Sequence, residues 1–118
     1  MKLIKSFKVT PADTARQIGS GTLRVLATPK VAAWFEGMAT ELAANAKANT
    51  EETSVGTNIN LDHLKKSLVG ETITCEVTLT EREGNKMTFT AEAFNEKREL
   101  IARATHTRFV VNIERFMK

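Results

Sequence analysis

The chain has 118 residues, of which 42% are hydrophobic and 26% are charged, with a formal net charge of +3. This length suits one domain spanning residues 1–118, and the apolar fraction can build a core, which excludes a largely disordered chain. Basic residues are scattered among acidic ones without a basic run, so we expect no nucleic-acid partner.

The targeting and redox signals favour a cytoplasmic protein without a membrane partner. The first ten residues, MKLIKSFKVT, contain no apolar core of signal-peptide length, and no stretch approaches the roughly 20 apolar residues of a membrane span. A single cysteine, Cys75, excludes a disulfide within the chain, which suits a reducing compartment. His63 and His106 lack the spacing of a metal site, so we expect neither metal nor cofactor.

The first half of the chain predicts a strand at residues 2–10, a polar loop with a short helical turn, an extended lead-in at 23–26 and one long helix. Thr28 followed by Pro29 is typical of a helix start, with a hydroxyl N-cap before a proline. Apolar side chains then recur at helical spacing until the helix ends near residue 48, and alanines flank this apolar face. Glu36 falls just past the alanine flank. The apolar positions are Val31, Trp34, Phe35, Met38, Leu42 and Ala46.

The second half predicts four strands, at residues 53–61, 71–82, 85–95 and 99–113. Apolar and polar residues alternate in each, which indicates an antiparallel sheet covered on one face. A strand, a long helix and four strands form an α+β layout. A curved antiparallel sheet wrapped around one long central α-helix is the solution that buries the helix face, and this is the hotdog fold.

Three stretches resemble the fluoroacetyl-CoA thioesterase-like branch of the hotdog superfamily. They are ATPKVAAWFEGMATELAA, the segment from TSVGTNINLDHL through TAEAFNE, and ARATHTRFVVNIERF, and the resemblance covers roughly residues 20–116. It implies a thioesterase that hydrolyses a small acyl-CoA as a homodimer or higher homo-oligomer, with water as co-substrate. The family's catalytic threonine, glutamate and histidine match Thr28, Glu36 and His63. Ser67-Leu68 departs from relatives that often carry a proline there.

Each of these residues also fits a plainer interpretation. Thr28 suits a simple N-cap, Glu36 a solvated residue at the helix boundary, and His63 a surface residue just after a strand. Gly56, a glycine in mid-strand, fits either a bulge or a close backbone approach to a ligand, and we predict a substrate contact there. His106 and Cys75 are assigned to the core.

Helix geometry limits the mechanism. Thr28 and Glu36 lie eight residues apart, which is about 12 Å along a helix, so their side chains cannot touch within one helix. Substrate and water bridge them, or one group comes from a second subunit. Glu36 and His63 are expected to activate the attacking group, with Thr28 as nucleophile or positioning hydroxyl and helix N-terminal amides holding the oxyanion.

Two alternatives stay open for the function. A non-catalytic acyl-CoA-binding or regulatory module could use the same fold, and the discriminating feature is whether Glu36 and His63 converge on one cleft. Thioesters of an acyl carrier protein form a further substrate class. A hydratase on this fold is disfavoured because the sequence contains no Asp-His hydratase motif.

Overall fold

The computed structural model describes residues 1–46 and 49–118. The strands and the long helix lie within a few residues of their predicted ranges, and the predicted helix end near residue 48 lies outside the described residues. In chain order the elements are β1 (Lys2–Lys8), a 3₁₀ turn (Pro11–Asp13), α1 (Ala15–Ile18), α2 (Thr28–Ala46), β2 (Glu52–His63), β3 (Thr72–Glu83), β4 (Lys86–Phe94), β5 (Leu100–Asn112) and α3 (Ile113–Phe116).

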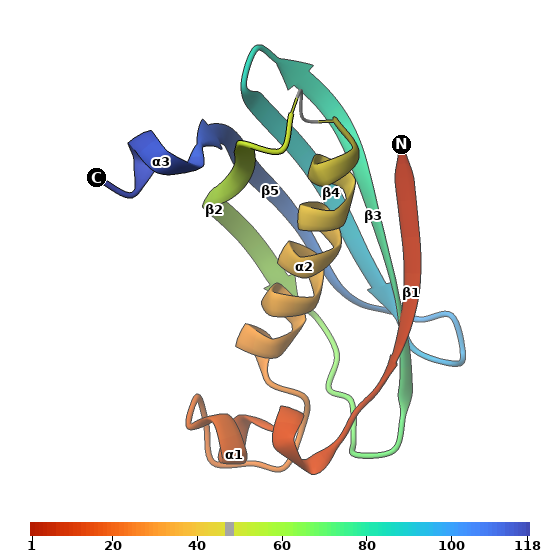
Figure 1. The fold of residues 1–118 in the computed structure, drawn as a ribbon. Coiled ribbons are helices and arrows are strands. Elements are labelled where there is room, and N and C mark those ends of the chain that lie inside the picture. Colours follow the sequence, from red (N-terminus) through yellow and green to blue (C-terminus); the bar gives the residue numbers. More distant parts are fainter. Residues whose placement is uncertain (47–48) are drawn as a thin grey trace.

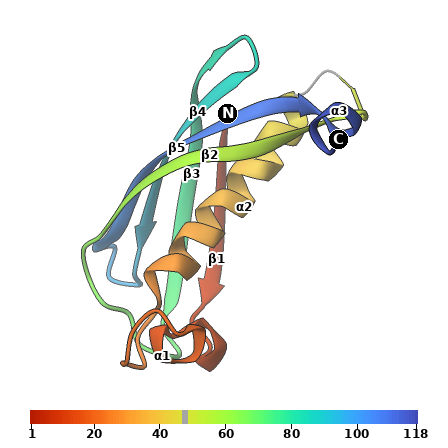
Figure 2. The same cartoon turned by 90° about the vertical axis from the view of Figure 1, so that its left-hand side faces the viewer.

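The strands form one antiparallel sheet with the order β1-β3-β4-β5-β2, so that β1 and β2 are its edges. The sheet curves around α2, as Figure 2 shows, and α1 and α3 lie near opposite ends of the molecule (Figure 1). The predicted apolar face of the helix is buried against the sheet. It contributes Val31, Trp34, Phe35, Met38, Ala39, Leu42 and Ala43 to the core, together with Ile73, Val77, Phe89 and Ile101 from the sheet.

One element was not expected from the sequence. The last strand ends at Asn112 and the chain turns into α3, where the alternation had predicted strand to residue 113. The Asn112 side chain accepts a hydrogen bond from the backbone N–H of Arg115 at 3.0 Å. Asn112 therefore caps the short helix α3. The sequence analysis missed this cap because the apolar residues before it predicted a continuing strand.

Strand β2 contains a bulge at the mid-strand glycine. Its pairing with β5 shifts register between Gly56 and Asn58, which leaves Thr57 as the extra residue. The bulge interpretation of Gly56 is therefore confirmed. The strand continues to His63, which pairs with Ala102, two residues beyond the predicted strand end.

Candidate active site

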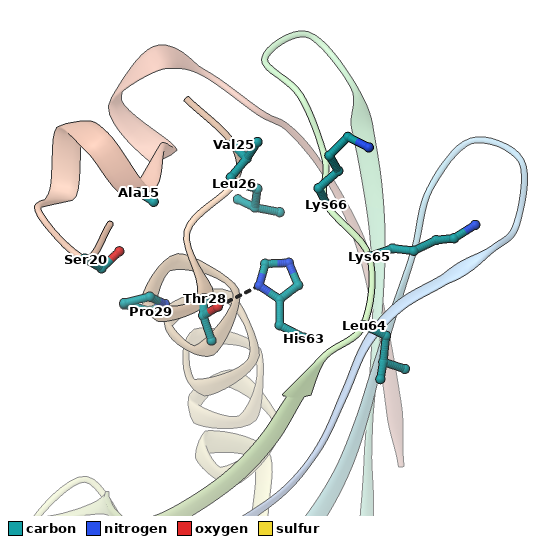
Figure 3. Close-up of a pocket in the computed structure, with 10 residues that line it drawn as sticks. All are labelled: Ala15, Ser20, Val25, Leu26, Thr28, Pro29, His63, Leu64, Lys65 and Lys66. Atoms are coloured by element: carbon teal, nitrogen blue, oxygen red, sulfur yellow. Dashed lines mark hydrogen bonds between the residues drawn. The ribbon is translucent and has the colours of Figure 1, made fainter. Parts of the chain in front are cut away.

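Thr28 and His63 meet at one end of α2, as Figure 3 shows. Oγ1 of Thr28 lies 2.7 Å from Nδ1 of His63, although the two residues are 35 positions apart in the sequence. Thr28 is the first residue of α2 and His63 the last residue of β2. The packing of helix on sheet therefore builds a hydroxyl–imidazole pair from two regular elements, which hold it more rigidly than loops would.

The Thr28 hydroxyl is free for this contact because it does not cap the helix. The carbonyl of Ala27 accepts hydrogen bonds from the N–H groups of Lys30, at 3.0 Å, and Val31, at 3.2 Å. Those are the amides that an N-cap hydroxyl at Thr28 would have satisfied. The N-cap prediction for Thr28 is therefore wrong, since the helix begins one residue earlier than the threonine–proline pattern indicated.

A cavity of about 300 Å³ opens beside the pair. It is lined by Ala15, Ser20, Val25, Leu26, Thr28, Pro29, His63, Leu64, Lys65 and Lys66 (Figure 3). None of these lining residues is acidic, and none is a phenylalanine, tyrosine or tryptophan. Lys65 forms an ion pair with Glu99, away from the cavity. The imidazole of His63 is the one lining group whose ordinary pKa lies near neutral pH, so we assign acid–base chemistry at the cavity to the His63–Thr28 pair.

The environment of His63 favours its neutral form. Burial lowers the pKa of His63 below the ordinary 6.5, and the backbone of Lys65 partly offsets this effect. A neutral imidazole can accept a proton from Thr28 through Nδ1. Its other nitrogen, Nε2, is buried and has no hydrogen-bond partner within residues 1–46 and 49–118. A hydrogen-bond acceptor at Nε2 would hold the orientation of the imidazole ring and set its tautomer.

Glu36 lies in a second cluster, around Gly56, and does not line the Thr28–His63 cavity. A Cβ atom at Gly56 would lie 3.1 Å from Oε2 of Glu36, 3.2 Å from Nη1 of Arg108 and 3.2 Å from Cε1 of His106. The close backbone approach at Gly56 is thus made to protein side chains. Within one chain the structure brings Thr28 to His63 and Glu36 to Gly56, but it leaves the two pairs apart.

Arg108 and His106 complete this second cluster, and both are buried. Nδ1 of His106 lies 2.7 Å from the carbonyl of Asn58, and Nη1 of Arg108 lies 3.2 Å from Nε2 of His106. Arg108 also donates to the hydroxyl and carbonyl of Ser54, at 2.9 and 3.0 Å. Burial lowers the pKa values of both residues, and the Glu36 carboxylate opposes this lowering by its negative charge.

Sequence reasoning assigned His106 to the core, where it lies, and overlooked Arg108. The signal was present, because Arg108 occupies an inward position of the β5 alternation, between His106 and Val110. A charged residue in such a row is seldom buried without a partner, so it marks a polar site.

The remaining candidates are inert. Burial raises the pKa of the Cys75 thiol to about 12, which keeps it protonated, in agreement with its assignment to the core. Within the part of the chain that the structure describes, no three histidine, cysteine or carboxylate side chains group to hold a metal ion. No helix among those residues is long and apolar enough to cross a membrane.

A family model described as fluoroacetyl-CoA-specific thioesterase matches residues 9–114. The chain belongs to this family. No sequence among curated proteins matches the chain significantly. The family match covers both clusters described above and every strand of the sheet except β1.

Solved structures agree with the family match. A mutant of the thioesterase FlK with fluoroacetate and CoA bound is 24% identical, with a TM-score of 0.89 over 98% of this chain and 96% of that one. A thioesterase superfamily member from Thermus thermophilus is 21% identical, with a TM-score of 0.89 over 99% and 85%. A hot-dog-like protein from Thermanaerovibrio acidaminovorans is 20% identical, with a TM-score of 0.88 over 99% and 85%. The predicted hotdog fold is confirmed.

Proposed function

We propose that this member of the thioesterase family hydrolyses small acyl-CoA thioesters at the Thr28–His63 pair. The 2.7 Å contact between Oγ1 and Nδ1 is the observation that carries the proposal. Neutral His63 accepts the hydroxyl proton while the oxygen attacks the thioester carbonyl, and the thiol leaves with that proton. Water then hydrolyses the acyl-threonine. FlK structures contain CoA with fluoroacetate, or acetyl-CoA, which supports the same substrate class here.

The small volume of the cavity limits the acyl group. About 300 Å³ is at the lower end of the range for small-molecule sites, which favours a short acyl chain. Substrate specificity therefore favours acyl groups of a few carbons. Lys66 forms no ion pair within residues 1–46 and 49–118, and it adds positive charge to the cavity lining.

We further propose that two copies pair through β2, an exposed edge of the sheet. Antiparallel pairing about a two-fold axis between Ile59 and Asn60 sets His63 of one copy opposite Gly56 of the other. The Glu36 cluster at Gly56 then lies beside the hydroxyl–imidazole pair of the second copy. This homodimer joins the residues that one chain keeps apart.

The oxyanion donors in this proposal differ from those expected at the helix start. Pro29 has no N–H, and the N–H groups of Lys30 and Val31 already donate to Ala27. The bulge at Gly56 turns Thr57 out of the ladder with β5. Backbone N–H groups of this bulge in the second copy are therefore the proposed donors, and Gly56 keeps its predicted role as a substrate contact.

Thiol release from a panel of acyl-CoA thioesters tests the proposal. The wild-type chain is expected to release thiol from at least one small acyl-CoA, and His63→Ala is expected to lower kcat at least about 10²-fold. Thr90→Val, on an exposed position of β4, is the matched control for changes at Thr28. Stoichiometric CoA binding without any thiol release would instead favour the non-catalytic binding module. A cytoplasmic location is part of the proposal as well, because a single cysteine forms no disulfide within the chain and so suits a reducing compartment.

A further inference from the structure

Backbone hydrogen bonds join the start of α1 to residues 23–25, and these two segments contribute to two different cavities. The N–H of Ala15 donates to the carbonyl of Val25 at 2.8 Å, and the N–H of Arg16 donates to that of Leu23 at 3.0 Å. Ala15 and Val25 line the Thr28–His63 cavity. Their neighbours Arg16 and Arg24 line a separate cavity of about 310 Å³. Adjacent residues of these two segments thus line two different cavities.

The second cavity carries positive charge without a counter-charge. It is lined by Pro11, Thr14, Arg16, Gln17 and Arg24, none of them acidic. Within residues 1–46 and 49–118, neither guanidinium forms an ion pair or a side-chain hydrogen bond, whereas Arg98 and Arg103 both pair with carboxylates.

The one buried acid of this segment is already engaged. The Asp13 carboxylate accepts hydrogen bonds from the backbone and hydroxyl of Thr10, at 2.8 and 2.9 Å, and lies 3.5 Å from Nζ of Lys30. Two like charges beside one cavity repel each other until an anion enters. Guanidinium groups match phosphate oxygens with two parallel donors, and the Gln17 amide adds another donor at the wall.

We propose that Arg16 and Arg24 bind the phosphates at the nucleotide end of acyl-CoA. The inference rests on the proposed function, because it assigns this second cavity to the same substrate. In a CoA thioester many rotatable bonds separate the acyl group from the phosphates, so the anionic end needs a site of its own outside the thioester cavity. Arg16 and Arg24 are each adjacent in sequence to a residue that lines the thioester cavity, so the two cavities lie close together.

The assignment distinguishes CoA from smaller thioesters. Contacts that hold the phosphates equally in the ground state and the transition state lower KM and leave kcat unchanged. A substrate that ends at the pantetheine arm has no phosphates and gains nothing from the two arginines. Arg16 and Arg24 thus select substrates that carry CoA, and they take no part in the bond-breaking step.

The test is calorimetric titration of the full chain with adenosine 3′,5′-bisphosphate, which carries the anionic groups without a thioester. The Arg16→Gln/Arg24→Gln double variant is expected to bind at least about tenfold more weakly than wild type, and the wild-type affinity is expected to fall as salt rises. Arg115→Gln, an exposed change on α3 at the other end of the molecule, is the matched control (Figure 1). Equal affinity in wild type and double variant, or no binding by wild type, would overturn the proposal.

Kinetics separate this proposal from the proposed function. The double variant is expected to raise KM for acetyl-CoA about tenfold at unchanged kcat, and to hydrolyse acetyl-pantetheine as wild type does. An equal rise in KM for both substrates would show a merely structural role for the arginines and would contradict the proposal. An effect confined to an acyl-carrier-protein thioester would also contradict it. If the chain binds the nucleotide through these arginines but releases no thiol from any acyl-CoA, the anion site is supported and the proposed thioesterase activity is contradicted.

Discussion

Oε2 of Glu36 lies 3.1 Å from the position that a Cβ atom at Gly56 would occupy. The glycine of the β2 bulge thereby sets how close the carboxylate can approach the sheet. Gly56→Ala forces Glu36, Arg108 or His106 to move by a few tenths of an ångström, and all three side chains are packed together. We expect kcat/KM to fall more than about tenfold and the free energy of unfolding to fall by about 1–3 kcal/mol.

Gly37→Ala is the control for this change. Gly37 is an exposed glycine inside α2, one residue after Glu36, and a Cβ atom there meets nothing within 4 Å. The alanine is expected to raise the free energy of unfolding by about 0.5–1 kcal/mol through helix propensity, with unchanged activity. Thermal unfolding and thiol release measure both variants. Gly56→Ala with wild-type activity would show that the Glu36 cluster does not serve the reaction.

Replacing Thr28 by serine or by valine tests whether its hydroxyl takes part in the reaction. Because the hydroxyl contacts His63 and does not cap α2, Thr28→Ser keeps the reacting group and Thr28→Val removes it at nearly constant volume. We expect the serine variant to stay within about tenfold of wild type in kcat, and the valine variant to lose at least about 10²-fold. Equal rates for the two variants in a thiol-release assay would exclude the hydroxyl from the chemistry.

The pH dependence of activity follows from the burial of His63. Its pKa lies below the ordinary 6.5, so the base stays neutral at pH values where an exposed histidine has already gained a proton. The rate constant kcat/KM for acetyl-CoA is expected to stay level as pH falls from 8 to about 6.5, and to drop only below that value as His63 becomes protonated. A profile that is already half-maximal above pH 6.5 would contradict His63 as the base.

Mixing two inactive variants tests whether the site is shared between copies. Glu36→Gln and His63→Ala each damage every site in a homodimer. In a mixed dimer whose sites combine Glu36 of one copy with His63 of the other, one of the two sites is intact. Co-refolded variants are therefore expected to recover about a quarter of wild-type activity. No recovery, in a sample that light scattering shows to be dimeric, would place Glu36 and His63 of the same chain in one site.

The spacing of apolar residues along the sequence was enough to predict the long helix and the strands. The apolar residues of α2 recur at helical spacing and are buried, and the alternation in β3, β4 and β5 matches the burial of those strands. These patterns are local, so a short stretch of sequence is enough to predict its own secondary structure. The end of β2 and the cap at Asn112 depend on single contacts, and there the predicted boundaries were off by one or two residues.

The candidate site was predictable only in part. Thr28, Glu36 and His63 came from the resemblance, and no local pattern could say that Thr28 meets His63 while Glu36 meets Gly56. Those contacts depend on how α2 lies across the sheet. The capping role of Thr28 failed because the Ala27 carbonyl already accepts from the two amides concerned. The Arg16–Arg24 pair was not predicted. The backbone hydrogen bonds that bring residues 15–16 close to residues 23–25 leave no periodic pattern in the sequence of this loop.

Selectivity for the fluorinated substrate is expected to be weak, although the family is named for it. Discriminating fluorine from hydrogen in so small an acyl group requires a pocket that excludes water from the reacting carbon. The segment that covers the Thr28–His63 cavity offers Ala15, Ser20, Val25 and Leu26, and its other large apolar residues, Ile18 and Leu23, are 44% and 66% exposed. The cavity lining contains no phenylalanine, tyrosine or tryptophan, so we expect water to reach the thioester whichever acyl group is bound. Values of kcat/KM for acetyl-CoA and fluoroacetyl-CoA, measured side by side, are expected to differ by much less than about 10⁴-fold. A preference of that size, worth about 5.5 kcal/mol of transition-state binding, would show that the cavity closes in the complex by a rearrangement of residues 11–27.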